Sequence, residues 1–523
     1  TINSLFLSLK SMLKKYANEY VDFAIILLAL AGMVFSHALM SFALAFMAVR
    51  TLFANKKRLK ESRKDLLAVL LSYFALILVG ILWSENKAEA LQQLNKNLPF
   101  LIVPLYFFTV PLPNKKQTHS LAFAFVAMLV VESVIALIRL YIFDFQDIRT
   151  ALPFGSHIRF ALFVCCAICF LGIYITNHRK QIRRSELFFA MLCMIYFVAY
   201  LVLSSSLTGI AILLLIILPI GLIFVKRHFS KTVFYSMLIL ICFSVSGLAF
   251  YVFKCAEDYF VPKETMCKDC FIENGYYCYR TDDKNKEKQY AEMAKGMQET
   301  LGINADSLFQ DKEYKYPYLD IAVRYFNSKG LERNLENWNR LTDKDKENIR
   351  NGIPNYVYAE SNPLKVRLYK TFFELESYRK KGKIKGSSIV QKLEMWHKSI
   401  LLSKDDCNAL CGVGTGDLKD ALEGKLQECD SQLAGNNLKP HNQYLTIYVT
   451  FGAIGVLLFG FWLIYPAVAT HAIKDAYYLC FFAIMLMSML SEDTLDNQQG
   501  IMFFCVLNSL LICRNAVRNK KDL

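Results

Sequence analysis

The stretch HSLAFAFVAMLVVESVIALIRLYIF, residues 119–143, decides the fold class. Glu132 and Arg139 are its acidic and basic residues. A helix of about 20 mostly apolar residues spans a bilayer because its backbone polar groups are satisfied within the segment. The stretch therefore predicts a membrane-spanning helix. Glu132 and Arg139 are about two turns apart and share a face, either as a buried ion pair or as functional groups, since charges inside a membrane are costly.

Runs of the same kind recur along the chain. The sequence of 523 residues is 54% hydrophobic with a mean hydropathy of +0.29, which is too apolar for a soluble domain. About twelve runs approach the length of a span, near 21–35, 37–54, 65–83, 98–112, 119–143, 158–177, 186–203, 207–225, 232–253, 443–467, 475–491 and 500–514. We therefore expect an all-α, polytopic membrane protein of about 12 transmembrane helices.

The distribution of basic residues predicts the orientation. Lys and Arg collect on every second loop, as in 56–64, 179–184 and 514–521, and such flanks are retained in the cytoplasm. Both termini are then cytoplasmic. The hydrophilic segment 254–440 faces the other side and carries nearly equal numbers of acidic and basic residues. The net charge of +15 is therefore a topology signal that also favours anionic membrane lipids as partners, and it does not indicate nucleic-acid binding.

Three regions follow from this pattern. Residues 1–253 hold helices one to nine, residues 254–442 form one large, mainly helical loop domain, and residues 443–523 hold helices ten to twelve with a cytoplasmic tail. Within the loop, residues 364–378 carry apolar side chains at helical spacing. In an oxidising periplasm the seven polar-segment cysteines favour disulfides, and a zinc site using Cys267-x-x-Cys270 is the alternative.

Two short motifs carry possible chemistry. Residues 412–417, GVGTGD, place alternate glycines before a helix. Backbone N–H groups in such a loop, including those of Gly414 and Gly416, can bind a phosphate, but the same glycines also suit a tight turn. Residues 439–445, KPHNQYL, place a histidine where the polar segment meets an apolar run, and an imidazole there can accept a proton or bind an anion.

The order of these motifs resembles the O-antigen ligase family over roughly residues 65–515. The series runs from Ser204-Ser205-Ser206-Leu207-Thr208-Gly209 through QKLEMW…GVGTGD (Gln391 to Asp417) and HNQYL to residues 491–500, SEDTLDNQQG. Residues 260–385 then look like an added insert. The resemblance implies a GT-C-like membrane body of twelve helices, with the large loop in the periplasm of a bacterial inner-membrane protein.

The resemblance also implies an activity. Family members transfer a glycan from undecaprenyl diphosphate to a hydroxyl acceptor, usually on the lipid A core, with inversion at the sugar and without a metal or other cofactor. In the family the functional residues are an Arg in an S-R-x-G turn, an Arg four residues before a Trp, and the His of H-N-x-x-L. This chain has Leu207 and Lys392 at the two Arg positions, and it keeps the third as His441. Arg binds a diphosphate bidentately, whereas Lys supplies only a point charge.

These comparisons give the candidate site. We expect His441 and Lys392 to be catalytic. The candidate substrate-binding residues are Arg139, Arg149 and Arg159, which could compensate for Leu207, with Asn442, Tyr444, Glu492, Gly414 and Gly416. Glu492 could position Lys392 or His441, or bind acceptor hydroxyls.

Other functions remain open from the sequence. The same superfamily includes O-antigen polymerases and protein O-glycosylating enzymes. From another class come a transporter or flippase of lipid-linked sugars and an inactive assembly subunit. A transporter would place polar groups near the midplane of the membrane, whereas this chain gathers its motifs at one face.

Overall fold

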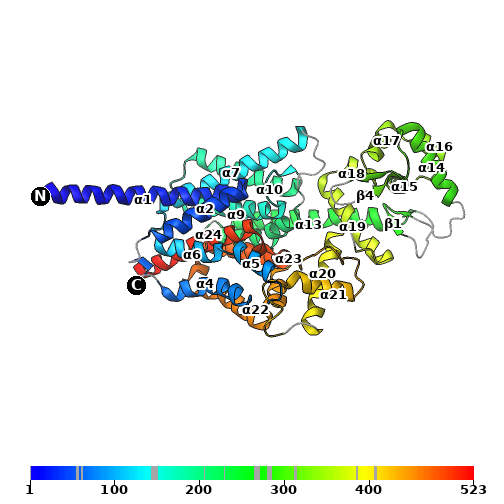
Figure 1. Cartoon of the computed structure of the whole chain (residues 1–523). Coiled ribbons are helices and arrows are strands. Elements are labelled where there is room, and N and C mark those ends of the chain that lie inside the picture. Colours follow the sequence, from blue (N-terminus) through cyan, green and yellow to red (C-terminus); the bar gives the residue numbers. More distant parts are fainter. Residues whose placement is uncertain are drawn as a thin grey trace. The chain divides into compact units, whose positions relative to one another are not determined.

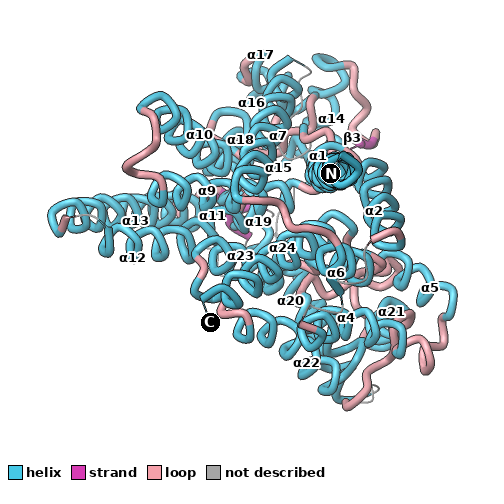
Figure 2. Tube along the Cα trace, turned by 90° about the vertical axis from the view of Figure 1, so that its left-hand side faces the viewer, coloured by secondary structure: helices cyan, strands magenta, loops and turns pink. Residues whose placement is uncertain are grey.

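The computed structural model describes residues 2–54, 58–59, 63–142, 151–204, 206–228, 230–263, 271–278, 286–310, 315–384, 387–405 and 409–522. The chain divides into two compact units. The first comprises residues 1–234 with 392–523, and the second comprises residues 235–391. Helices dominate both units, and strands are confined to short segments (Figure 2). The expected all-α class is therefore confirmed.

The first unit is a bundle of helices (Figure 1). Its elements are α1 (Ile2–Phe35), α2 (His37–Leu52), α4 (Lys64–Val79), α5 (Lys87–Lys96), α6 (Pro99–Thr109), α7 (Lys115–Ile142), α9 (His157–Asn177), α10 (Arg184–Leu203), α11 (Leu207–Ile212), η1 (Leu213–Ile217), α12 (Leu218–His228), α21 (Leu418–Glu428), α22 (Gln443–Ala469), η2 (Ala472–Lys474), α23 (Ala476–Ser491), η3 (Thr494–Asp496) and α24 (Gln498–Asp522). Two further helices cross the unit boundary, α13 (Lys231–Phe260) and α20 (Ser388–Asp405).

Each of the twelve apolar runs falls on helical structure. Among the described residues, six helices are both long and apolar enough to cross a membrane, namely α7, α9, α10, α13, α22 and α24 up to Arg518. Other runs form shorter helices such as α2 and α23, of 16 residues each, and a helix of that length rises only about 24 Å against a core of about 30 Å. A multi-pass membrane protein is supported, and the number of twelve spans stays a prediction.

Aromatic side chains hold the centre of the first unit together. Tyr73 of α4 lies with its ring centroid 4.8 Å from that of Phe100 in α6 and 4.8 Å from that of Trp462 in α22. The indole N–H of Trp462 donates to the Leu70 carbonyl at 3.1 Å. These rings are buried, and edge-to-face pairs add to the stabilisation from burial. The contacts fix α22 against α4 and so place the residues at the start of α22.

The second unit contains smaller helices and two short hairpins. Its elements are β1 (Phe271–Glu273), β2 (Tyr276–Cys278), α14 (Lys286–Leu301), β3 (Leu308–Gln310), β4 (Lys315–Pro317), α15 (Tyr318–Lys329), α16 (Leu335–Arg340), α17 (Asp343–Arg350), α18 (Tyr356–Glu360) and α19 (Pro363–Lys381). Both hairpins are antiparallel. Trp338 is fully buried and stacks on Phe326, with 5.7 Å between ring centroids. This unit therefore has a core of its own.

The expected loop domain of residues 254–442 stays a prediction, and the compact second unit covers only part of it. The second unit ends at Gln391, because the chain beyond it packs on the first unit. The Asp417 carboxylate accepts hydrogen bonds from the N–H groups of Glu85 and Asn86 at 2.8 and 2.7 Å. These hydrogen bonds connect the loop before α21 with the turn between α4 and α5.

Two cysteines of the polar segment, Cys255 and Cys429, do not form the disulfides expected there. Cys255 and Cys429 are free thiols. Cys255 is buried on α13 with Tyr259 and Tyr369 around it, so an aromatic cluster encloses it. Cys267 and Cys270, the proposed half of a zinc site, lie outside the described residues.

Candidate functional site

Three side chains from distant parts of the first unit meet at one point. Lys392 comes from α20, His441 from the turn before α22, and Glu492 from the residue after α23. The Glu492 Oε1 atom lies 2.7 Å from Lys392 Nζ, and Glu492 Oε2 lies 3.7 Å from His441 Nδ1. The carboxylate thus stands between an ammonium and an imidazole. Lys392 also donates to the Ser491 carbonyl at 2.8 Å.

This group lies away from the chain termini. Figure 1 shows the two ends of the chain at one end of the first unit, and α5, α20 and α21 at the other. The His441 side chain is 43% exposed, whereas that of Glu492 is 8% exposed. A substrate can therefore reach the imidazole from solvent, and the carboxylate is enclosed behind it.

The backbone at His441 is held in an uncommon conformation. Its φ of 53° lies in the left-handed region, which costs a non-glycine residue energy and calls for external support. The indole N–H of Trp396 supplies support by donating to the Pro440 carbonyl at 2.8 Å. The main-chain N–H of His441 donates to Asp493 Oδ2 at 2.9 Å. The QKLEMW helix and the SEDTLD turn thus fix the direction in which the imidazole points.

Asn442 and Tyr444 position α22. The Asn442 side chain caps the helix by accepting from the N–H groups of Tyr444 and Leu445 at 3.1 and 3.2 Å. The hydroxyl of Tyr444 donates to the Leu486 carbonyl of α23 at 3.2 Å. Both side chains therefore have structural partners, and their geometry explains why α22 begins directly after His441.

The surroundings shift the pKa values of Glu492 and Asp493 in opposite directions. Burial raises the pKa of Glu492, but His441 and Lys392 more than offset that effect and hold its pKa at about 2. Burial also raises the pKa of Asp493, and here the hydrogen bond from the Thr446 hydroxyl, 2.6 Å long, offsets it only in part. Glu492 is consequently an anion at neutral pH. Nδ1 is the ring nitrogen of His441 that faces this carboxylate, so Nε2 is the nitrogen on the other side of the ring.

A second cluster beside the first escaped the sequence analysis. Asp496 pairs with Lys96 of α5 at 2.5 Å and with Lys439 of the KPHNQYL stretch. Burial raises the pKa of Asp496, but Lys439 and Lys96 reverse that effect and lower it. Lys439 is the first residue of the KPHNQYL motif and could have been suspected, whereas nothing in the sequence indicates that Lys96 contacts a residue 400 positions later.

The three candidate arginines fall in different places. Arg159, on the first turn of α9, is half-buried and close enough to Glu492, Asp493 and Asp496 to interact with them electrostatically. Its Nε atom is buried and, among the described residues, has no hydrogen-bond partner. Arg139 lies in the last turn of α7. Arg149 lies outside the described residues.

The glycine loop serves packing. The Gly414 N–H donates to the Thr450 carbonyl at 2.9 Å, and the Gly416 N–H donates to Ser84 Oγ at 2.9 Å. A Cβ atom on Gly416 would lie 2.2 Å from the Asn86 carbonyl oxygen. The N–H groups that would bind a phosphate are thus already used, and the close approach explains the glycine. The tight-turn interpretation fits, and we leave Gly414 and Gly416 out of the proposed substrate site.

A small polar pocket adjoins the second cluster. Its volume is about 50 Å³, and hydrogen-bonding side chains line it, among them Glu89, Gln93, Asn97, Lys439 and Asp496. The Asn97 Oδ1 atom is buried and, within the described chain, accepts no hydrogen bond. Amides and carboxylates of this kind bind hydroxyl groups.

Comparison with known proteins gives no family for this chain. No known family model matches the sequence, and no curated protein matches it. Among the described residues no group of three or more His, Cys, Asp or Glu side chains could hold a metal ion.

Proposed function

We propose that the chain is a membrane glycosyltransferase that moves a glycan from undecaprenyl diphosphate to a hydroxyl acceptor with inversion at the sugar and without a metal. The acceptor we favour is the lipid A core, as in the O-antigen ligases whose motif order this chain resembles. The observation that carries the proposal is the meeting of Lys392, Glu492 and His441, within electrostatic reach of Arg159. The proposed setting is the periplasmic face of a bacterial inner membrane.

His441 acts as the general base. Its Nδ1 faces Glu492 at 3.7 Å, so its Nε2 is the atom that accepts the proton of the acceptor hydroxyl. The hydroxyl oxygen then attacks the anomeric carbon from the face opposite the diphosphate. A new carbon–oxygen bond forms as the bond to the diphosphate oxygen breaks, and that bond's electron pair leaves with the diphosphate. A positioned base of this kind contributes about 10²–10⁴-fold to the rate.

Cations stabilise the departing diphosphate. Lys392 pairs with Glu492, and Arg159 interacts electrostatically with the same carboxylate. Negative charge that develops on the leaving group attracts both cations. The turn in which the family carries its Arg packs against α9, since a Cβ atom on Gly209 of that turn would lie 3.1 Å from the Cβ of Ala161. Arg159 is on the same helix, and we propose that it compensates for Leu207.

The test is a transfer assay on the purified chain. The protein in detergent is mixed with undecaprenyl-diphosphate glycan and, separately, with lipid A core, a second donor molecule, and a Ser/Thr peptide. A gain in acceptor mass together with release of free undecaprenyl diphosphate supports the proposal, and the productive acceptor separates a ligase from a polymerase or a protein O-glycosylating enzyme. No product with any acceptor contradicts it and favours the transporter or assembly-subunit alternatives.

A further inference from the structure

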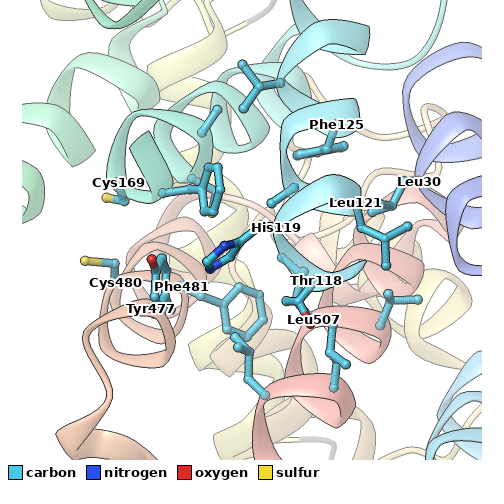
Figure 3. Close-up of a pocket in the computed structure, with 18 of the residues that line it drawn as sticks. Leu30, Thr118, His119, Leu121, Phe125, Cys169, Tyr477, Cys480, Phe481 and Leu507 are labelled. Atoms are coloured by element: carbon cyan, nitrogen blue, oxygen red, sulfur yellow. The ribbon is translucent and has the colours of Figure 1, made fainter. Parts of the chain in front are cut away.

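An apolar cavity opens inside the first unit at the end opposite to His441. Its volume is about 130 Å³, and its walls come from α1, α7, α9, α23 and α24. Leu30, Leu121, Phe125 and Leu507 are among the side chains that line it (Figure 3). From Thr118 to Val126 it follows more than two turns of α7, about 12 Å, which is a depth suited to a hydrocarbon chain.

The polar groups of this cavity gather at one end. They are Thr118 and His119 near the start of α7, Tyr477 near the start of α23, and Arg514 on α24. Figure 3 shows His119 projecting from α7 toward Tyr477. Arg514 is close enough to His119 and Tyr477 to interact electrostatically with both. The cavity is therefore apolar along most of its length, with Arg514 as the cationic side chain at its polar end.

A basic pocket adjoins that polar end. It has a volume of about 500 Å³ and is lined by Lys115, Thr176, Asn177, His178, Arg179, Lys180 and Gln181. The two spaces are neighbours, separated by the edge-to-face contact of the His119 and His178 rings, whose centroids are 5.2 Å apart. Lys115, Arg179 and Lys180 therefore line the pocket beyond the polar end of the cavity, and Arg514 lines the cavity itself.

We infer that this paired space binds one anionic phospholipid, with an acyl chain in the apolar cavity and the phosphate among Lys115, Arg179 and Arg514. An apolar cavity alone would accept any hydrocarbon, and a basic pocket alone would accept any anion. Because the two are neighbours at His119 and His178, together they favour a molecule that has both a hydrocarbon chain and an anionic group. Basic residues at the ends of spans attract anionic headgroups in the cytoplasmic leaflet.

This site is separate from the proposed transfer site. Tyr477 and Glu492 lie at opposite ends of α23, which places them about 22 Å apart along the helix. The inference needs the helices to lie in a membrane, and it does not depend on glycan transfer.

Native mass spectrometry of the full chain in detergent tests the inference. Phosphatidylglycerol and phosphatidylethanolamine with identical acyl chains are added in equal amounts. We expect a phosphatidylglycerol adduct that inorganic phosphate does not displace. Arg514→Gln should weaken phosphatidylglycerol binding about fivefold, as expected for one basic residue at a lipid headgroup. Arg518→Gln, an exposed position one turn further along α24, should leave the binding unchanged.

Filling the cavity gives a second readout. Ala122 lines the wall, and Ala122→Leu should reduce phosphatidylglycerol retention even though all basic residues remain. The unfolding midpoint of each variant reports whether it folds. Equal retention of the two lipids by the wild type, an equal effect of Arg514→Gln and Arg518→Gln, or displacement of the adduct by phosphate alone would overturn the inference.

Discussion

The main-chain N–H of His441 donates to the carboxylate of Asp493 at 2.9 Å, across 52 positions of sequence. This bond ties the turn before α22 to the turn after α23, and it helps to hold His441 at its positive φ. Asp493 is itself buried and held by the Thr446 hydroxyl. Two neighbouring carboxylates thus act on His441 in different ways. Asp493 holds its main chain, and Glu492 faces its ring.

Replacing Thr446 with Val tests this support. The buried Asp493 carboxylate would lose its 2.6 Å donor, and leaving a buried polar group unsatisfied costs about 1–3 kcal/mol. We expect Thr446→Val to lower the free energy of unfolding by that amount, measured by circular dichroism in one detergent. The control is Thr450→Val, because the Thr450 hydroxyl donates to the Thr446 carbonyl of its own helix, α22, and not to a carboxylate of the described residues. Equal losses in the two variants would contradict a special role for Asp493.

The Glu492 pKa predicts a pH dependence of stability. Its pKa falls from 4.5 to about 2 in the folded chain, so the folded state favours the ionised carboxylate. The resulting stabilisation is fully present above pH 4.5 and is lost as the pH falls toward 2, an effect on the order of 3 kcal/mol. We expect the stability difference between the wild type and Glu492→Gln to shrink as the pH is lowered from 6 to about 3. A difference that stays constant over this range contradicts the assigned environment.

The glycine loop gives a sharp packing test. A Cβ atom on Gly416 would meet the backbone oxygen of Asn86 at 2.2 Å and the backbone nitrogen of Ala90 at 2.8 Å, and backbone atoms cannot move aside cheaply. We expect Gly416→Ala to destabilise the first unit by about 1–3 kcal/mol. Gly424 on α21 has open space where a Cβ would be placed, so Gly424→Ala should stabilise by up to about 1 kcal/mol. The measurement is the unfolding midpoint of each variant. A Gly416→Ala midpoint equal to that of the wild type would contradict the packing role.

Arg159 can be tested by rescue. If Arg159 stabilises the departing diphosphate, Arg159→Gln should reduce glycan transfer on the order of 100-fold with an unchanged elution volume in gel filtration. Restoring the family residue in the Leu207→Arg/Arg159→Gln double variant should recover part of the rate. Full activity of Arg159→Gln would show that the leaving group is stabilised elsewhere.

The sequence predicted the helices well because apolar runs report burial or membrane contact directly. All twelve runs lie on helices. The lengths of the helices were predicted less well. The apolar run 65–83, for example, extends beyond the end of α4 at Val79, because the following residues form a turn whose Glu85 and Asn86 N–H groups donate to Asp417. The short hairpins at β1–β2 and β3–β4 were missed, because segments of three residues carry almost no periodicity.

The candidate site was predicted in part. The motif order pointed to His441, Lys392 and Glu492, which the structure brings together. The partners Lys96 and Asp496 were not singled out, because their pairing depends on tertiary contacts between α5 and the turn after α23. The two glycines were assigned a possible phosphate role because a sequence does not show which N–H groups are already bonded within the fold.

The most direct test of the central claim compares two histidines in the transfer assay. His441→Gln removes the imidazole that faces Glu492, and His397→Gln changes an exposed histidine on α20. With undecaprenyl-diphosphate glycan and the productive acceptor, we predict that His441→Gln lowers kcat about 10²–10⁴-fold at an unchanged unfolding midpoint, whereas His397→Gln retains the wild-type rate. Wild-type transfer by a folded His441→Gln protein would contradict the account.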